Sequence, residues 1–106
     1  IHINLDRLNN GIISKKLLSN HTKPGIIIIN TSRGKIVDEN AIEWGLRKKI
    51  ISGYLADVLI DEPPTILNKL ILHENSLVTS HIASKTIKNV NKQANQAIKN
   101  LSLILE

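Results

Sequence analysis

Gly25-Ile26-Ile27-Ile28-Ile29-Asn30-Thr31-Ser32-Arg33-Gly34-Lys35 is the stretch that decides the fold of this 106-residue chain. Its four consecutive β-branched isoleucines, preceded by Pro24 and followed by polar residues, predict a short strand that is apolar on both faces. Such strands lie inside parallel sheets. Open α/β sheets bind ligands at the carboxyl ends of their strands, and the sequence places Arg33 at that edge. A solvated arginine in an ordinary loop is the alternative at this point.

The segments on either side predict helices and further strands. Residues 1–5 alternate apolar and polar side chains, as the end of a strand does. Ser14 is a suitable N-cap for a short helix that ends between His21 and Gly25. Asp38 is the expected N-cap of a second, amphipathic helix, which we predict to end near Gly53. The order of these elements favours parallel strands with helical crossovers.

The second half of the chain continues this alternation. Residues 54–58 predict a second buried strand that ends near Asp57, and residues 76–79 predict a third. Between them, residues 59–74 form the longest irregular stretch, with a helical turn possible at 67–72. A long amphipathic helix is expected over about 85–105. The predicted fold class is α/β, a Rossmann-like doubly wound parallel sheet of which only the second half is present.

Composition narrows the function classes. The net charge is +5, but the basic residues are dispersed and only one Trp and one Tyr accompany them, which disfavours nucleic acid as a partner. The chain has no Cys, so thiolate metal sites are excluded, and its four histidines are scattered, so no metal site is expected. No apolar run reaches membrane-spanning length, and a membrane is not expected as a partner.

Ionisable residues follow each of the three predicted strands. Arg33 follows the first, Asp57 and Glu62 follow the second, and His81 follows the third. Singly, the acids could cap a turn and the histidine could be a loop residue. Together at one sheet edge they suit proton transfer, because a carboxylate stabilises the protonated form of a neighbouring histidine. An arginine there can hold a substrate carboxylate and polarise a carbonyl group. If a dinucleotide binds at the same edge, these groups together predict a reaction in which hydride transfer is coupled to proton transfer.

Three ordered motifs carry a family resemblance. They are Ile29-Asn30-Thr31-Ser32-Arg33-Gly34-Lys35-Ile36-Val37-Asp38, Ala56-Asp57-Val58-Leu59-Ile60-Asp61-Glu62-Pro63 and Thr79-Ser80-His81-Ile82-Ala83. They resemble the second half of the NAD-binding domain of D-isomer-specific 2-hydroxyacid dehydrogenases, a family that includes phosphoglycerate, glyoxylate/hydroxypyruvate and D-lactate dehydrogenases. The resemblance covers nearly the whole chain.

The resemblance implies a role for each matching residue. Arg33 resembles the arginine that binds the substrate carboxylate and carbonyl oxygen, and His81 resembles the general acid/base that Glu62 orients. Asp57 resembles the residue that holds the nicotinamide carboxamide. The implied NAD-binding residues are Thr31, Ser32, Arg33, Asp57, His81, Ala83 and Ser84. The implied substrate is a small 2-hydroxy or 2-keto acid, and NAD is the implied cofactor, with NADP left open.

Some features depart from the family pattern. Ser80 stands where the family usually has Pro, and Ala83 stands where it often has Gly. The chain also lacks the G-x-G-x-x-G turn that holds a pyrophosphate, so we expect residues 1–106 to be a partial NAD(P)-binding domain from a longer protein.

The resemblance and the departures from it lead to several expectations about the isolated chain and the full-length enzyme. The isolated chain is expected to bind NAD poorly and to turn over no substrate. The full-length enzyme is expected to be a cytoplasmic homodimer. The alternatives are a non-catalytic NAD-sensing or corepressor-like relative, and a decayed gene fragment.

Overall fold

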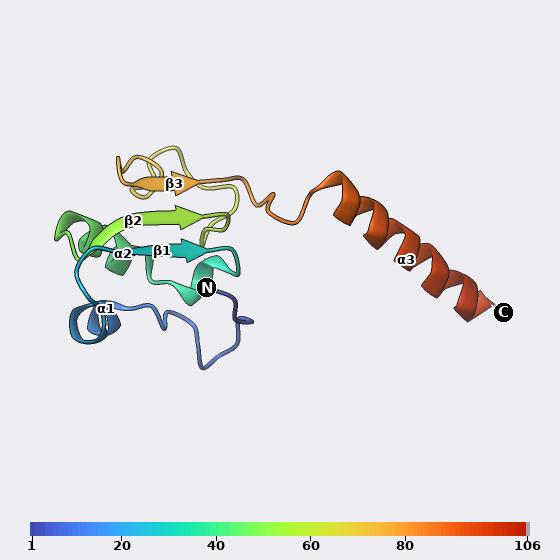
Figure 1. The fold of residues 1–106 in the computed structure, drawn as a ribbon, viewed down its shortest axis with the longest axis horizontal. Coiled ribbons are helices and arrows are strands. Elements are labelled where there is room, and N and C mark those ends of the chain that lie inside the picture. Colours follow the sequence, from blue (N-terminus) through green and yellow to red (C-terminus); the bar gives the residue numbers. More distant parts are fainter. Residues whose placement is uncertain (106) are drawn as a thin grey trace.

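The computed structural model describes residues 1–105, and its central feature is a parallel sheet with the strand order β1-β2-β3. β1 (Ile26–Asn30) pairs with β2 (Ile51–Ala56), and β2 pairs with β3 (Ser76–Val78), each time in parallel. All three predicted buried-sheet segments are therefore strands, and the expected half of a Rossmann-like α/β sheet is confirmed. The three carboxyl ends lie on one edge of the sheet (Figure 1).

Two short helices begin at the predicted N-caps. α1 (Lys15–His21) follows Ser14, whose Oγ accepts a hydrogen bond from the Leu17 N–H at 3.4 Å. After β1, the single turn η1 (Gly34–Ile36) leads to α2 (Glu39–Arg47). Asp38 caps α2, because its Oδ1 accepts from the N–H groups of residues 40 and 41 at 3.0 and 3.3 Å. Both caps are local interactions, which is why the sequence predicts them well.

The hydrophobic core lies on one face of the sheet only. Leu18 of α1 and Ile42 of α2 pack with Ile28 and Tyr54 of the sheet in one buried cluster. On the opposite face Ile27 is 61% exposed, as are other apolar side chains, namely Ile29 and Leu77. The expectation that the first strand is buried on both faces is therefore wrong for the face that carries Ile27 and Ile29. The reason is that α1 and α2 cover the other face, whereas α3 (Ile87–Leu105) extends away from the sheet (Figure 1).

The amino-terminal segment differs from the prediction. Residues 1–5 form no strand. They are held beside β1 by separate contacts: the terminal ammonium of Ile1 donates to the Ile29 carbonyl at 2.7 Å, and the Ile3 carbonyl accepts a hydrogen bond from the Ser32 hydroxyl. This segment thus contacts the end of β1 and the loop after it without forming a ladder of its own.

The boundary between α2 and β2 also lies earlier than predicted. The helix ends at Arg47 instead of near Gly53, and β2 begins at Ile51. Lys49 adopts a left-handed φ of 58°, and the Ile50 N–H donates to the Gly45 carbonyl at 2.9 Å. This turn satisfies carbonyl groups at the end of the helix, so the helix stops although the apolar spacing continues through Ile50.

The remaining segments follow the expectations closely. The long stretch between β2 and β3 contains no helix or strand, and Leu70, at 1% exposure, anchors it in the core. α3 begins two residues after the predicted start and buries none of its residues. Within residues 1–105, no helix has the length and apolar content needed to cross a membrane.

Candidate active site

The loop after β1 is ordered by a buried asparagine. Asn30 is fully buried at the last position of β1; its Oδ1 accepts from the Ser32 N–H at 3.1 Å, and its Nδ2 donates to the Arg33 carbonyl at 3.1 Å. These bonds form a local turn of the kind that Asn side chains favour. Sequence reasoning missed this role, although an Asn that ends a run of isoleucines is a usable signal for it.

A close backbone contact brings this loop against the segment after β2. A Cβ built on Gly34 would lie 2.0 Å from the Leu59 carbonyl oxygen, so that only glycine fits here. The contact places Arg33 next to the segment that carries Glu62. The guanidinium of Arg33 is exposed, and its Nη1 donates to the Ser32 carbonyl at 2.7 Å.

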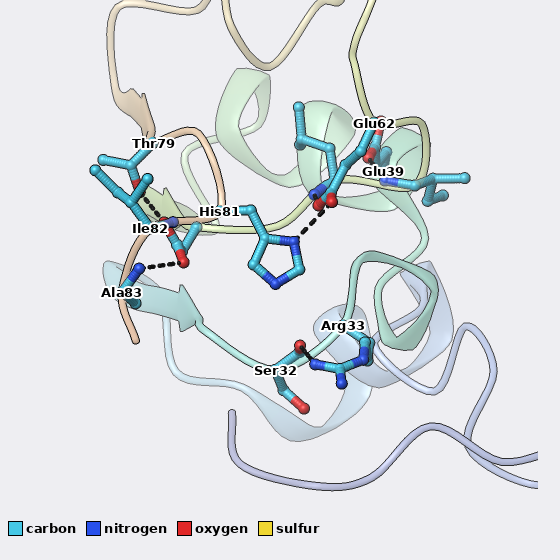
Figure 2. A network of polar contacts seen from close by, with 11 residues as sticks. Ser32, Arg33, Glu39, Glu62, Thr79, His81, Ile82 and Ala83 are labelled. Atoms are coloured by element: carbon cyan, nitrogen blue, oxygen red, sulfur yellow. Dashed lines mark hydrogen bonds and ion pairs between the residues drawn. The ribbon is translucent and has the colours of Figure 1, made fainter. Parts of the chain in front are cut away.

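Glu62 and His81 form a pair that joins the second and third loops. The Nδ1 of His81 lies 2.7 Å from Oε2 of Glu62, and Oε1 of Glu62 accepts from the Leu59 N–H at 3.1 Å (Figure 2). The side chains are 46% and 38% exposed, which leaves the imidazole accessible to a ligand. The hydrogen bond with His81 holds the pKa of Glu62 below its ordinary value; partial burial opposes this shift, and the Leu59 N–H supports it.

Asp57 is a buried carboxylate that holds the loop around His81. Its Oδ1 accepts from the Thr79 hydroxyl at 2.5 Å and from the Ile82 N–H at 2.9 Å, and its Oδ2 accepts from the Ala83 N–H at 2.8 Å. Burial alone would raise the pKa of Asp57, but the hydrogen bonds from Thr79, Ala83 and Ile82 outweigh it and lower the pKa. Asp57 is thus ionised, and it holds the Thr79 side chain before His81 and the backbone N–H groups of the two residues after it.

His81 itself has an uncommon backbone conformation. Its φ is 57°, in the left-handed region that few non-glycine residues adopt. The bonds to Asp57 from the Thr79 hydroxyl and from the Ile82 N–H hold the residues on either side of it. In Figure 2 the imidazole ring lies between Glu62 on one side and the Ser32–Arg33 turn on the other.

Arg33, Glu62 and His81 line one cleft of about 320 Å³, to which Leu5 and Lys35 also contribute. The predicted trio is therefore brought together at the carboxyl edge of the sheet. Figure 2 shows Ser32 next to Arg33 and Ala83 on the other side of His81, while Thr31 and Ser84 are exposed in the first and third loops.

Other ionisable groups near the sheet are less suited to chemistry at this edge. Residues 1–105 contain no group of three or more His, Cys, Asp or Glu side chains placed to hold a metal ion. Tyr54 is the single tyrosine of the chain, and burial raises its pKa to about 12. Its phenol therefore stays protonated at neutral pH inside the core.

A parallel sheet with a helical crossover and polar loops at its carboxyl edge defines the class of Rossmann-like α/β domains. A model of one family in this class, "D-isomer specific 2-hydroxyacid dehydrogenase, NAD binding domain", matches residues 1–83. The chain belongs to this family, as its three motifs predict.

Individual relatives agree with this assignment. Over 77 residues the chain is 36% identical to D-3-phosphoglycerate dehydrogenase 2, chloroplastic, of Arabidopsis thaliana. The aligned region covers 69% of this chain and 12% of that protein. Over 106 residues it is 32% identical to glyoxylate reductase of Thermofilum pendens. This alignment covers 100% of this chain and 31% of that protein.

A solved structure gives the same result for the fold. The crystal structure of D-lactate dehydrogenase with NAD+ from Lactobacillus jensenii matches with a TM-score of 0.85 and 27% identity, over 92% of this chain and 33% of that one. The chain thus spans a third or less of the length of these three relatives.

Proposed function

We propose that this chain contributes the catalytic residues of an NAD-dependent oxidoreductase that interconverts a 2-hydroxy acid and its 2-keto acid. The observation that carries the proposal is the 2.7 Å contact between His81 and Glu62, in a cleft that Arg33 also lines. The relatives, which are named for phosphoglycerate, glyoxylate and lactate, support an acid of this size. In this proposal residues 1–106 are part of an NAD-binding domain in a longer enzyme.

Each member of the trio has a defined task. The Arg33 guanidinium binds the substrate carboxylate through two parallel hydrogen bonds and polarises the adjacent carbonyl group. His81 gives its proton to the carbonyl oxygen in the reductive direction and removes the hydroxyl proton in the oxidative direction. Glu62, ionised because its pKa is lowered, accepts from Nδ1 of His81 and stabilises the imidazolium form. The ring nitrogen that faces the substrate is then Nε2.

The chemistry that a bound nicotinamide supplies is hydride transfer to or from the substrate carbon. Asp57 fits the role of holding the carboxamide, because its Oδ2 accepts one hydrogen bond in the described part of the chain and a carboxylate oxygen can accept two. Thr31, Ser32, Ala83 and Ser84 border the same end of the cofactor in this proposal. NAD is the cofactor of the family domain, and use of NADP stays open. We also expect the whole enzyme to be a cytoplasmic homodimer, which rests on the family alone.

A chimaera tests the proposal. The segment of Thermofilum pendens glyoxylate reductase that matches this chain is replaced by residues 1–106, and the oxidation of NADH with glyoxylate is measured. Saturable turnover is expected. His81→Gln should then lower kcat by at least about 100-fold, the effect of losing a general acid. The matched control His21→Gln changes an exposed histidine of α1 and should leave kcat unchanged.

Two results would contradict the proposal. One is full turnover by the His81→Gln chimaera, which would remove His81 from proton transfer. The other is a folded chimaera that binds NADH without turnover, which would favour the non-catalytic NAD-sensing alternative.

A further inference from the structure

Two neighbouring N–H groups in the segment that follows β2 donate to two different glutamates. The Leu59 N–H donates to Oε1 of Glu62 at 3.1 Å, and the Ile60 N–H donates to Oε1 of Glu39 at 2.8 Å. Glu39 is far away in sequence, at the first position of α2. Its second oxygen, Oε2, accepts from Nδ2 of Asn68 at 3.2 Å. Glu39, which lies near Glu62 in Figure 2, thus ties α2 to two points of the segment between β2 and β3.

These contacts distinguish Glu39 from an ordinary acidic residue at a helix start. A carboxylate in the first turn of a helix is commonly favourable because it faces the positive end of the helix dipole. In α2, however, the free N–H groups at the helix start are taken by Asp38, which accepts from residues 40 and 41. Both Glu39 oxygens are instead engaged by the loop after β2. The side chain therefore acts on that loop more than on its own helix.

We propose that Glu39 is a positioning residue that holds Glu62 in place to orient His81. The path is short: Glu39 fixes the Ile60 N–H, the turn from Leu59 to Glu62 is thereby held, and Oε2 of Glu62 meets Nδ1 of His81 at 2.7 Å. This role rests on the proposed function only in that the His81–Glu62 pair is taken as the acid/base. The effect of Glu39 on the pair, which passes through the Ile60 N–H, can be measured without any turnover.

The required feature of Glu39 is an acceptor at the correct reach, and its charge is secondary. Glu39→Gln keeps an oxygen within reach of the Ile60 N–H and removes the charge, at the cost of the bond from Asn68, whose Nδ2 then faces the NH2 group of the new amide. Glu39→Asp keeps the charge at the helix start but is one methylene shorter, so it does not reach the N–H. Glu39→Ala removes both. A matched control is Glu43→Gln, which removes a carboxylate from the same helix that is paired with Arg47 at 3.2 Å.

The experiment uses NMR spectroscopy of the 106-residue chain at neutral pH. Two signals are followed in each variant: hydrogen exchange of the Ile60 amide, and exchange of the Nδ1–H of the His81 ring, which reports its bond to Glu62. In Glu39→Ala and Glu39→Asp both should exchange at least about five-fold faster, the effect expected from losing one hydrogen bond. Glu39→Gln and Glu43→Gln should retain the wild-type rates of both signals.

The outcomes decide between positioning and a merely structural or electrostatic role. Faster exchange at Ile60 with an unchanged His81 ring signal would overturn the proposal, because the loop would move without affecting the pair. Wild-type behaviour of Glu39→Asp together with loss in Glu39→Gln would also overturn it, because charge would then be the active property. If Glu39→Ala unfolds the chain, the Gln and Asp variants still decide. An inactive chimaera alongside these expected NMR results would reject the proposed function and leave the positioning role intact.

Discussion

Replacing Asp57 by Asn tests how the loop that carries His81 is held. The wild-type carboxylate accepts three hydrogen bonds at 2.5, 2.9 and 2.8 Å, two of them from the backbone N–H groups of Ile82 and Ala83. An amide has one acceptor oxygen and one NH2 group. In either orientation of the amide, one of the two backbone N–H groups faces that NH2. The variant therefore loses one charge-assisted bond from a partly buried donor.

The expected cost is about 2–3 kcal/mol in the free energy of unfolding, the size of one hydrogen bond to a charged group. With a urea m-value of about 1–3 kcal/mol/M for a small protein, the unfolding midpoint should fall by roughly 1 M. Circular dichroism of the 106-residue chain in urea measures this shift. Asp61→Asn is the matched control, because it removes the same charge from an exposed position in the same segment.

The effect should depend on pH in a defined direction. The pKa of Asp57 is lowered in the folded chain, so its contribution to stability is fully present above the pKa of an unfolded Asp, about 4, and is lost as the pH falls through the lower folded value. The difference between wild type and Asp57→Asn should therefore be constant near pH 7 and shrink below about pH 4. An unchanged midpoint for Asp57→Asn at pH 7 would refute the reasoning, and so would a difference that grows on acidification.

Further predictions concern the close backbone contact and the isolated chain. Gly34→Ala should lower the unfolding free energy by about 1–3 kcal/mol, because its Cβ would lie 2.0 Å from the backbone oxygen of Leu59, a contact that only a backbone shift relieves. Gly53→Ala is the control, since the added Cβ meets side-chain atoms of Ile27 at an ordinary 3.7 Å; equal urea midpoints for the two variants would contradict this explanation. The isolated 106-residue chain should show no saturable NADH binding in the micromolar range by fluorescence titration, and a clear saturation curve there would show that the missing pyrophosphate turn is dispensable.

The local features of this protein could be read from its sequence because they depend on neighbouring residues. The isoleucine run forms a strand through β-branching and the punctuation around it. Ser14 and Asp38 cap helices through bonds that span two or three residues. The trio of Arg33, Glu62 and His81 was predictable for a different reason: parallel strands present their carboxyl ends at one edge, so residues just after each strand meet there.

Tertiary structure decided what depends on contacts between distant segments. The bond from Ile60 to Glu39 spans 21 residues and the bond from Ala83 to Asp57 spans 26, and no local pattern encodes which N–H a carboxylate will meet. The same holds for the contact of Gly34 with the Leu59 backbone and for the left-handed backbone of His81, each set by how two loops pack. Burial of the sheet likewise depended on where the helices lie, so that the four isoleucines, alike in sequence, differ in exposure. The sequence thus determined which side chains lie at the carboxyl ends of the strands, and the packing of the loops determined how these side chains are oriented.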